Sequence, residues 1–262
     1  MAHMCVREIG RHTRIFSKRN KEYAIVSTQP NGDFWKIFPL NRRRPALEEE
    51  EASRTALLLR AAREAGEARR NPPVLMLNNY MGSDGEYNVV CEFRADRVEG
   101  LEEYIERQGG RLSYSAACLL LVALHSQYDM LLSKGKMIPF YSLKDIIVVD
   151  DIFMYANPSK LLEFSQFRAV VNVPYNRHSR GSFYPPEIWN RRTIPYYVTP
   201  HATLFSMAYM ITVCLFGDLP VNCDWEESHW AKRLDQIYST KMYWCLLRCL
   251  YTEPEKRRFI II

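Results

Sequence analysis

The sequence predicts an α+β fold in two lobes, a small β-rich lobe over residues 5–93 and a larger, mainly helical lobe over residues 94–262. Three observations lead to this prediction. β-Branched and aromatic runs separated by turn residues dominate the first lobe, where they accompany a single helix. Helical apolar spacing dominates the chain after Phe93. Two later helices, Ser113–Ser133 and Ser206–Phe216, are apolar around most of their circumference, so we expect both to be buried.

The first lobe is predicted to begin with strands and to continue into its helix. Tyr23–Thr28 and Phe34–Phe38 are apolar and aromatic runs, and the turn sequence Pro30–Asp33 lies between them. A helix is expected over Pro45–Arg70. A proline suits its first turn, and the acidic run Glu48–Glu51 complements the positive end of the helix dipole.

Two further strands close the first lobe, and short elements fill the second. Val74–Tyr80 and Tyr87–Phe93 are joined by Gly82–Gly85, which has the composition of a hairpin turn. Around the two apolar helices, the same rules predict a short helix, a β-branched strand and a third helix. These are Gly100–Gln108, Ile146–Val149 and Lys241–Leu250.

Composition limits the classes of function. Of the 262 residues, 47% are hydrophobic and 25% are charged, which suits one domain made of two closely joined lobes. The net charge of +5 comes from basic residues spread along the chain, so direct nucleic-acid binding is not expected. The longest apolar run, Met207–Phe216, is too short to cross a bilayer, so no membrane association is expected.

The cysteines and histidines indicate neither a metal site nor a disulfide framework. The seven cysteines contain no Cys-x-x-Cys motif, and together with the six histidines they show no metal-ligand spacing. We therefore expect no metal and reduced thiols, as in an intracellular protein. The opening Met1–Met4 resembles a cloning remnant, which predicts that the domain belongs to a longer chain or a complex.

Six segments together resemble the motifs of one family, in the family's order and at similar intervals. They are Phe34–Ile37, Tyr87–Phe93, Ser133–Val149, Tyr184–Glu187, Ser206–Pro220 and Cys249–Arg257. The family is the protein kinases, and the resemblance covers nearly all of the chain. It implies a bilobal kinase-like fold in which residues 5–93 and 94–262 form one domain. It also implies that Glu187, in the place of the Ala-Pro-Glu glutamate, pairs with Arg257 of the last motif.

The chain departs from this family where the chemistry is done. Phe140–Ile147 resembles the catalytic loop, but Ser142 replaces the aspartate base and the loop is too short to keep the metal-binding asparagine. A serine hydroxyl cannot act as a carboxylate base at neutral pH. Asn157 stands where an aspartate would bind magnesium, and a neutral amide is a poor ligand for that ion. Arg54 occupies the place of the helix C glutamate, although Glu51, one turn earlier, is an alternative.

The nucleotide pocket is altered as well. Gly10 is the one glycine kept in the phosphate-covering loop, and the bulky Arg11–Arg14 follows it. Lys36 matches the lysine that pairs with nucleotide phosphates, and Cys91 matches the gatekeeper position. Phe34 replaces a small residue over the adenine and would fill that space. Gly10, Lys36 and Cys91 are therefore read as vestigial, and no cofactor is expected.

These losses lead to the hypothesis of a pseudokinase. Removing one group that stabilises the transition state typically costs ~3–4 kcal/mol, and several are changed here together. We expect no enzyme activity and a role as a scaffold or allosteric module for other proteins, with Tyr175–Arg180 as a candidate interaction surface. Met210–Gly217 also resembles the spindle-checkpoint kinase-like domains of the BUB type, which implies a role at the kinetochore in the nucleus.

Two other functions stay open at this point. In the first, the chain is an atypical serine/threonine kinase in which Asp145, Asp150 or Asp151 serves as a relocated base or ligand. A polar turn after a strand is the simpler explanation of the last two. In the second, a nucleotide is bound as a structural ligand without turnover. Lys36 favours that reading, whereas Phe34 and Asn157 oppose it.

Overall fold

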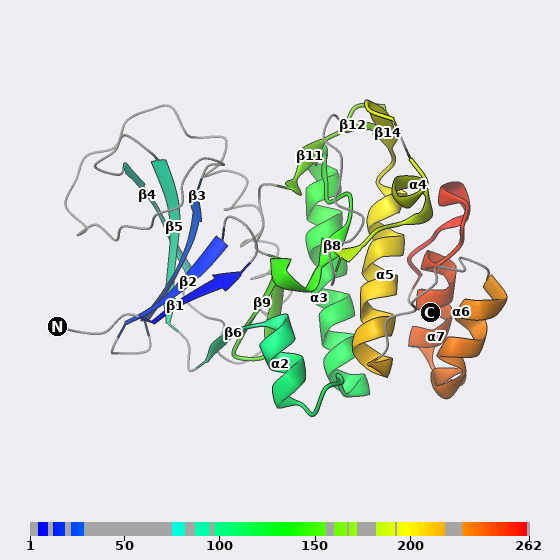
Figure 1. Cartoon of the computed structure of the whole chain (residues 1–262), viewed down its shortest axis with the longest axis horizontal. Coiled ribbons are helices and arrows are strands. Elements are labelled where there is room, and N and C mark those ends of the chain that lie inside the picture. The colour runs from blue at the N-terminus through cyan, green and yellow to red at the C-terminus, as the bar shows by residue number, and fades with distance from the viewer. Residues whose placement is uncertain are drawn as a thin grey trace. The chain divides into compact units, whose positions relative to one another are not determined.

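The computed structural model describes residues 5–9, 13–18, 22–28, 75–81, 87–94, 97–155, 160–166, 168–171, 182–191, 193–217 and 227–260. Helices and strands are both present, as the predicted α+β class requires. The chain divides into two compact units (Figure 1). One contains Met1–Leu101 together with Lys144–Leu161, and the other contains Glu102–Leu143 together with Leu162–Ile262.

The first unit contains a five-stranded antiparallel sheet in the order β1-β2-β3-β5-β4. The structure confirms the predicted strands over Tyr23–Thr28, Val74–Tyr80 and Tyr87–Phe93. The predicted strand at Phe34–Phe38 and the predicted helix at Pro45–Arg70 lie outside the described residues. The strands are β1 (Cys5–Ile9), β2 (Thr13–Lys18), β3 (Glu22–Thr28), β4 (Leu75–Met81) and β5 (Tyr87–Arg94).

A second, three-stranded sheet in this unit has the order β10-β9-β6. Its strands are β6 (Val98–Gly100), β9 (Ile146–Val149) and β10 (Ile152–Tyr155). β9 coincides with the β-branched run predicted as a strand, and all four of its residues are buried. An apolar strand that is buried on both faces reads as a continuous run rather than an alternating one, which explains the sequence of β9.

The second unit is mainly helical, with short two-stranded pairings attached to it. Its helices are α2 (Leu101–Arg107), α3 (Tyr114–Ser133), α4 (Pro186–Trp189), α5 (His201–Phe216), α6 (Glu227–Leu234) and α7 (Lys241–Cys249). Its strands are β7 (Lys136–Met137), β8 (Tyr141–Ser142), β11 (Leu162–Glu163), β12 (Ala169–Val171), β13 (Ser182–Phe183) and β14 (Tyr196–Val198). The pairs are β7–β11, β8–β13 and β12–β14, all antiparallel.

The long helices α3 and α5 lie side by side at the centre of this unit (Figure 1). α5 is buried along almost its whole length, as predicted from its apolar sequence. α3 was expected to be buried on most sides, and this is wrong for part of its surface, because Leu119 is 44% exposed and Val122 is 46% exposed. Only one side of α3 faces the core, so some of its apolar side chains are not buried by packing.

Within the described residues, α3 is the one helix long and apolar enough to cross a membrane by length and composition. Half of its most apolar window is buried inside the unit. Since the core helix of a soluble protein meets the same criterion, this is weak evidence for a membrane span, and the expectation of no membrane association stays a prediction.

A glycine ends α5. Gly217 has a φ of 75°, in the left-handed region, and its N–H donates to the Val213 carbonyl at 2.8 Å. A Cβ at this position would lie 2.6 Å from Nε of Arg111. Gly109 also has a positive φ, of 89°, but a Cβ there would meet nothing within 4 Å. The two glycines therefore share the conformational requirement and differ in the available space.

Gly217→Ala is expected to destabilise the second unit more than Gly109→Ala does. Both variants carry the left-handed penalty of about 1–2 kcal/mol, and only the first must also displace Arg111. Chemical denaturation of the two variants measures the difference. In an Arg111→Ala background the difference should disappear. Equal losses from the two variants with Arg111 present would show that its side chain moves aside freely.

Candidate functional site

The described residues include only part of the predicted site. Ser142, Glu187 and Arg257 are described in full, as are the alternative carboxylates Asp145, Asp150 and Asp151. Cys91 lies in β5 opposite Ile25 and Leu77. The other predicted positions fall outside the described residues. These are Gly10, Arg11, His12, Phe34, Lys36, Glu51, Arg54, Asn157 and Tyr175–Arg180, whereas Thr13 and Arg14 begin strand β2.

Ser142, at the expected place of a catalytic base, is part of a strand. It lies in β8, opposite Ser182 of β13, and is 5% exposed. Its neighbour Tyr141 pairs with Phe183 and is fully buried. A catalytic base must lie within hydrogen-bond reach of the substrate proton. A buried hydroxyl in a strand pair has neither the charge nor the access for that task.

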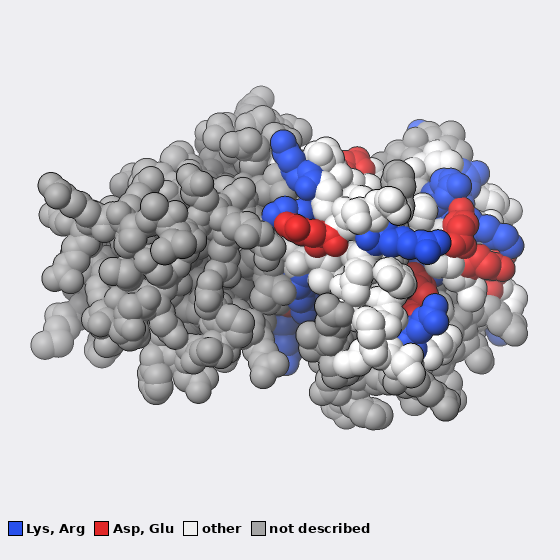
Figure 2. Space-filling model, turned by 90° about the horizontal axis from the view of Figure 1, so that it is seen from above, with Lys and Arg blue, Asp and Glu red and all other residues white. Residues whose placement is uncertain are grey.

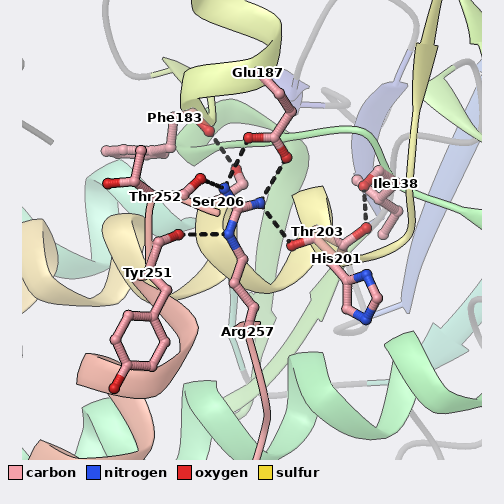
Figure 3. Close-up of polar contacts among 9 residues, drawn as sticks. All are labelled: Ile138, Phe183, Glu187, His201, Thr203, Ser206, Tyr251, Thr252 and Arg257. Atoms are coloured by element: carbon pink, nitrogen blue, oxygen red, sulfur yellow. Dashed lines mark hydrogen bonds and ion pairs between the residues drawn. The ribbon is translucent and has the colours of Figure 1, made fainter. Parts of the chain in front are cut away.

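Two hydroxyl side chains of α5 hold the segment that leads into β8 (Figure 3). Thr203 Oγ1 donates to the Ile138 carbonyl at 2.5 Å. Ser206 Oγ accepts from the Tyr141 N–H at 2.7 Å and donates to the Phe183 carbonyl at 2.5 Å. Both residues are completely buried, so their hydroxyls form hydrogen bonds with the protein in place of bonds to water. This role was not predicted, although serine and threonine residues within an otherwise apolar helix are a signal for it.

Asp145, the first alternative base, is engaged in an ion pair. Its side chain is 2% exposed, and its Oδ2 contacts Nζ of Lys160, which is 22% exposed. Both residues belong to the first unit. A buried carboxylate is stable when a cation lies beside it, and Lys160 supplies that charge. The pair explains Asp145 structurally, without a catalytic role.

The other two alternative carboxylates form the predicted turn. Asp150 and Asp151 connect β9 to β10 and both have positive φ values, 46° and 64°. A two-residue hairpin loop of type I′ requires such values, and aspartate tolerates them better than most residues. The Arg97 N–H donates to Asp150 Oδ1 at 2.7 Å, and the Asp150 N–H donates to the Arg97 carbonyl. The prediction of a polar turn is confirmed.

The structure brings Glu187 and Arg257 together, 70 residues apart in the sequence (Figure 3). Glu187 lies in the first turn of α4, and Arg257 follows the 3-10 turn Pro254–Lys256. The contact is bidentate, with Nη1 donating to Oε1 at 2.6 Å and Nη2 donating to Oε2 at 2.8 Å. Parallel bonds of this kind match the planar fork of a guanidinium to a carboxylate.

Three backbone carbonyls complete the shell around Arg257. Nε donates to Tyr251 at 2.7 Å, Nη1 to His201 at 3.2 Å and Nη2 to Thr252 at 2.9 Å. The five N–H groups of the guanidinium are thus all used. Its carbon lies 4.8 Å from the ring centroid of Phe205, and the whole side chain is 0% exposed.

No metal site stands out in the described part of the chain. No group of three or more His, Cys, Asp or Glu side chains lies together there. Burial raises the pKa of the Cys214 thiol to about 12, so this thiol is unreactive at neutral pH. The chain was also compared with known proteins, and neither the family models nor the curated proteins gave a match.

Glu187→Gln is expected to lower the free energy of unfolding by about 3–5 kcal/mol. The change removes the negative charge and leaves a buried guanidinium without its counterion. Denaturant unfolding measures the loss. The matched control is Lys256→Ala at the residue before Arg257. It removes the exposed Lys256–Glu253 pair and should change stability little. A small loss for Glu187→Gln would mean that the carbonyls alone support Arg257.

Ser206→Ala should cost about 1–3 kcal/mol, because it leaves the Tyr141 N–H and the Phe183 carbonyl buried without that partner. Thr212→Val is the control on the same helix. Thr212 Oγ1 donates only to the Ala208 carbonyl, one turn earlier in α5, so its loss should have little effect. Thermal unfolding of the two variants gives the comparison. Equal effects would show that the contact to β8 and β13 contributes nothing specific.

Proposed function

We propose that this chain is a catalytically inactive, kinase-like domain that acts as a scaffold or allosteric module for other proteins. The Glu187–Arg257 pair carries the proposal. The resemblance to protein kinases implies this contact between two segments that are far apart in sequence. Composition and periodicity alone give no reason to expect it.

The surroundings of Ser142 and Asp145 support the absence of catalysis. A kinase needs a carboxylate that can reach the substrate hydroxyl. At the position implied for it, the chain has a buried serine in the β8–β13 pair. The nearest carboxylate in sequence, Asp145, is buried beside Lys160. Asp150 and Asp151 serve the turn between β9 and β10. The atypical-kinase alternative therefore receives no support from these residues.

The cellular part of the proposal is a role at the kinetochore, in the nucleus. It rests on the similarity of Met210–Gly217 to the BUB-type domains, a stretch that forms the C-terminal half of α5 and its glycine cap. A domain of this kind would work through its surface, within a longer chain or a complex.

Nucleotide should neither stabilise the protein nor be turned over. A ligand at 100 times its dissociation constant adds ~2.7 kcal/mol, and each kcal/mol raises the melting temperature by about 2–4 °C at this chain length. We expect no shift with ATP in magnesium or in EDTA, and no phosphate transfer to a general protein substrate. A magnesium-dependent shift accompanied by transfer would contradict the proposal. A shift in EDTA that Lys36→Ala removes would identify ATP as a structural ligand.

If any phosphotransfer activity is measured, Asp145→Asn tests whether Asp145 is a relocated catalytic base or only the structural partner of Lys160. In the structure this residue balances Lys160, so the variant should lose about 3–5 kcal/mol of stability. Asp151→Asn, in the exposed turn, is the control and should leave stability almost unchanged. A stable Asp145→Asn protein that had lost a measured phosphotransfer activity would restore the relocated base.

A further inference from the structure

A pair of large apolar side chains faces solvent on the two-stranded ribbon of β12 and β14. Val170 lies directly opposite Tyr197, and their exposed fractions are 47% and 62%. The residues on either side of them point the other way. Ala169, Val171, Tyr196 and Val198 are buried and belong to one core cluster with Met137, Phe140 and Tyr184. The inner face of the ribbon is therefore used in packing, and the outer face is not.

The exposed apolar surface extends beyond this pair. Ile194, three residues before Tyr197, is 51% exposed, and Pro195, which precedes β14, is exposed as well. Single apolar residues on a surface are common, whereas neighbouring ones on one element mark interaction sites. A cross-strand pair of an aromatic and a β-branched residue also presents a firm surface, because the two side chains support each other.

The charge on this face is positive. Arg168 precedes Val170 by two residues, so the two side chains lie on the same, outer face of the ribbon, and Arg168 is exposed. Arg191, in the connection from α4 to β14, is exposed too. Glu163, an exposed carboxylate on β11, which contacts β12, is paired with Lys136, with 3.7 Å between Oε1 and Nζ. Figure 2 views the end of the second unit where β12 and β14 lie, and a broad uncharged area there is crossed by basic side chains, with acidic ones toward its margins.

The ribbon also offers an edge. Among the described strands, β14 pairs only with β12. A two-stranded ribbon gains stability from a third strand, and an unpaired edge offers a row of N–H and carbonyl groups to an extended chain. Recognition by strand addition takes its affinity from these main-chain bonds and its specificity from alternate side chains.

We propose that the outer face and edge of the β12–β14 ribbon form a docking surface for an extended segment of a partner protein in which apolar and acidic side chains alternate. Its apolar side chains would pack against Tyr197 and Val170, and its carboxylates would meet Arg168 and Arg191. A second copy of this chain is the poorer occupant, because it would bring the same arginines against them. The inference rests on the proposed function, since it names the surface through which a scaffold acts.

Selection from a displayed library of random nine-residue peptides against the full chain tests the docking surface. Enriched peptides should alternate β-branched or aromatic residues with Asp or Glu. Tyr197→Ser should weaken their binding by about tenfold or more, since truncating an aromatic anchor typically has that effect. Arg168→Glu should also weaken peptide binding, and the loss of affinity should be larger at low salt than at high salt. Tyr238→Ser is the matched control, because Tyr238 is 55% exposed elsewhere on the unit.

Four results would overturn the docking surface. They are the absence of any enrichment, enriched peptides that lack acidic residues, enriched peptides that bind Tyr197→Ser as well as the unchanged chain, and a concentration-dependent dimer that Tyr197→Ser dissociates. Thermal unfolding of each variant checks that its fold is kept. A phosphotransfer assay on the same preparation separates the two proposals. Transfer with intact peptide binding would refute only the inactive scaffold, whereas failed selection without transfer would refute only the docking surface.

Discussion

The buried guanidinium of Arg257 is the constraint around which the second unit is arranged. A charge without solvent is stable only when all of its donors are satisfied, and here they reach a carboxylate from α4 and carbonyls from the start of α5 and the segment after α7. Three separate parts of the chain must therefore converge within hydrogen-bond distance. α5, with Phe205 beneath the guanidinium, is the core element that they share.

Much the same principle operates at the other face of α5. Thr203 and Ser206 bond to main-chain groups of the 138–142 segment and of β13, so these short strands are held by side chains as well as by their own pairing. Pairs of two residues have few ladder bonds of their own. Their position depends on the helix, and the position of Ser142 depends on them. The region resembling a catalytic loop is thus built as part of the core.

Sequence patterns anticipated the elements that bury an apolar face, such as α5 and β9, because burial is what produces those patterns. They were less successful with α3, where apolar side chains exceed the buried surface and Leu119 and Val122 face solvent. The ribbon of β12 and β14 was not predicted, because three-residue strands are too short for a period of two to show. The Asp145–Lys160 contact was missed as well, since no local signal connects the two residues. The Glu187–Arg257 contact was anticipated by resemblance alone.

The Arg257 shell also imposes an order on the biogenesis of the protein. Glu187, His201 and Phe205 leave the ribosome some fifty or more residues before Arg257 does, a separation that follows from their positions in the chain. Until then α5 can pack against α3, but the carboxylate of Glu187 has no guanidinium to pair with. The second unit therefore completes its polar core only after residue 257 has been translated, and a nascent chain paused before that point would present α4 and the start of α5 in an unfinished state.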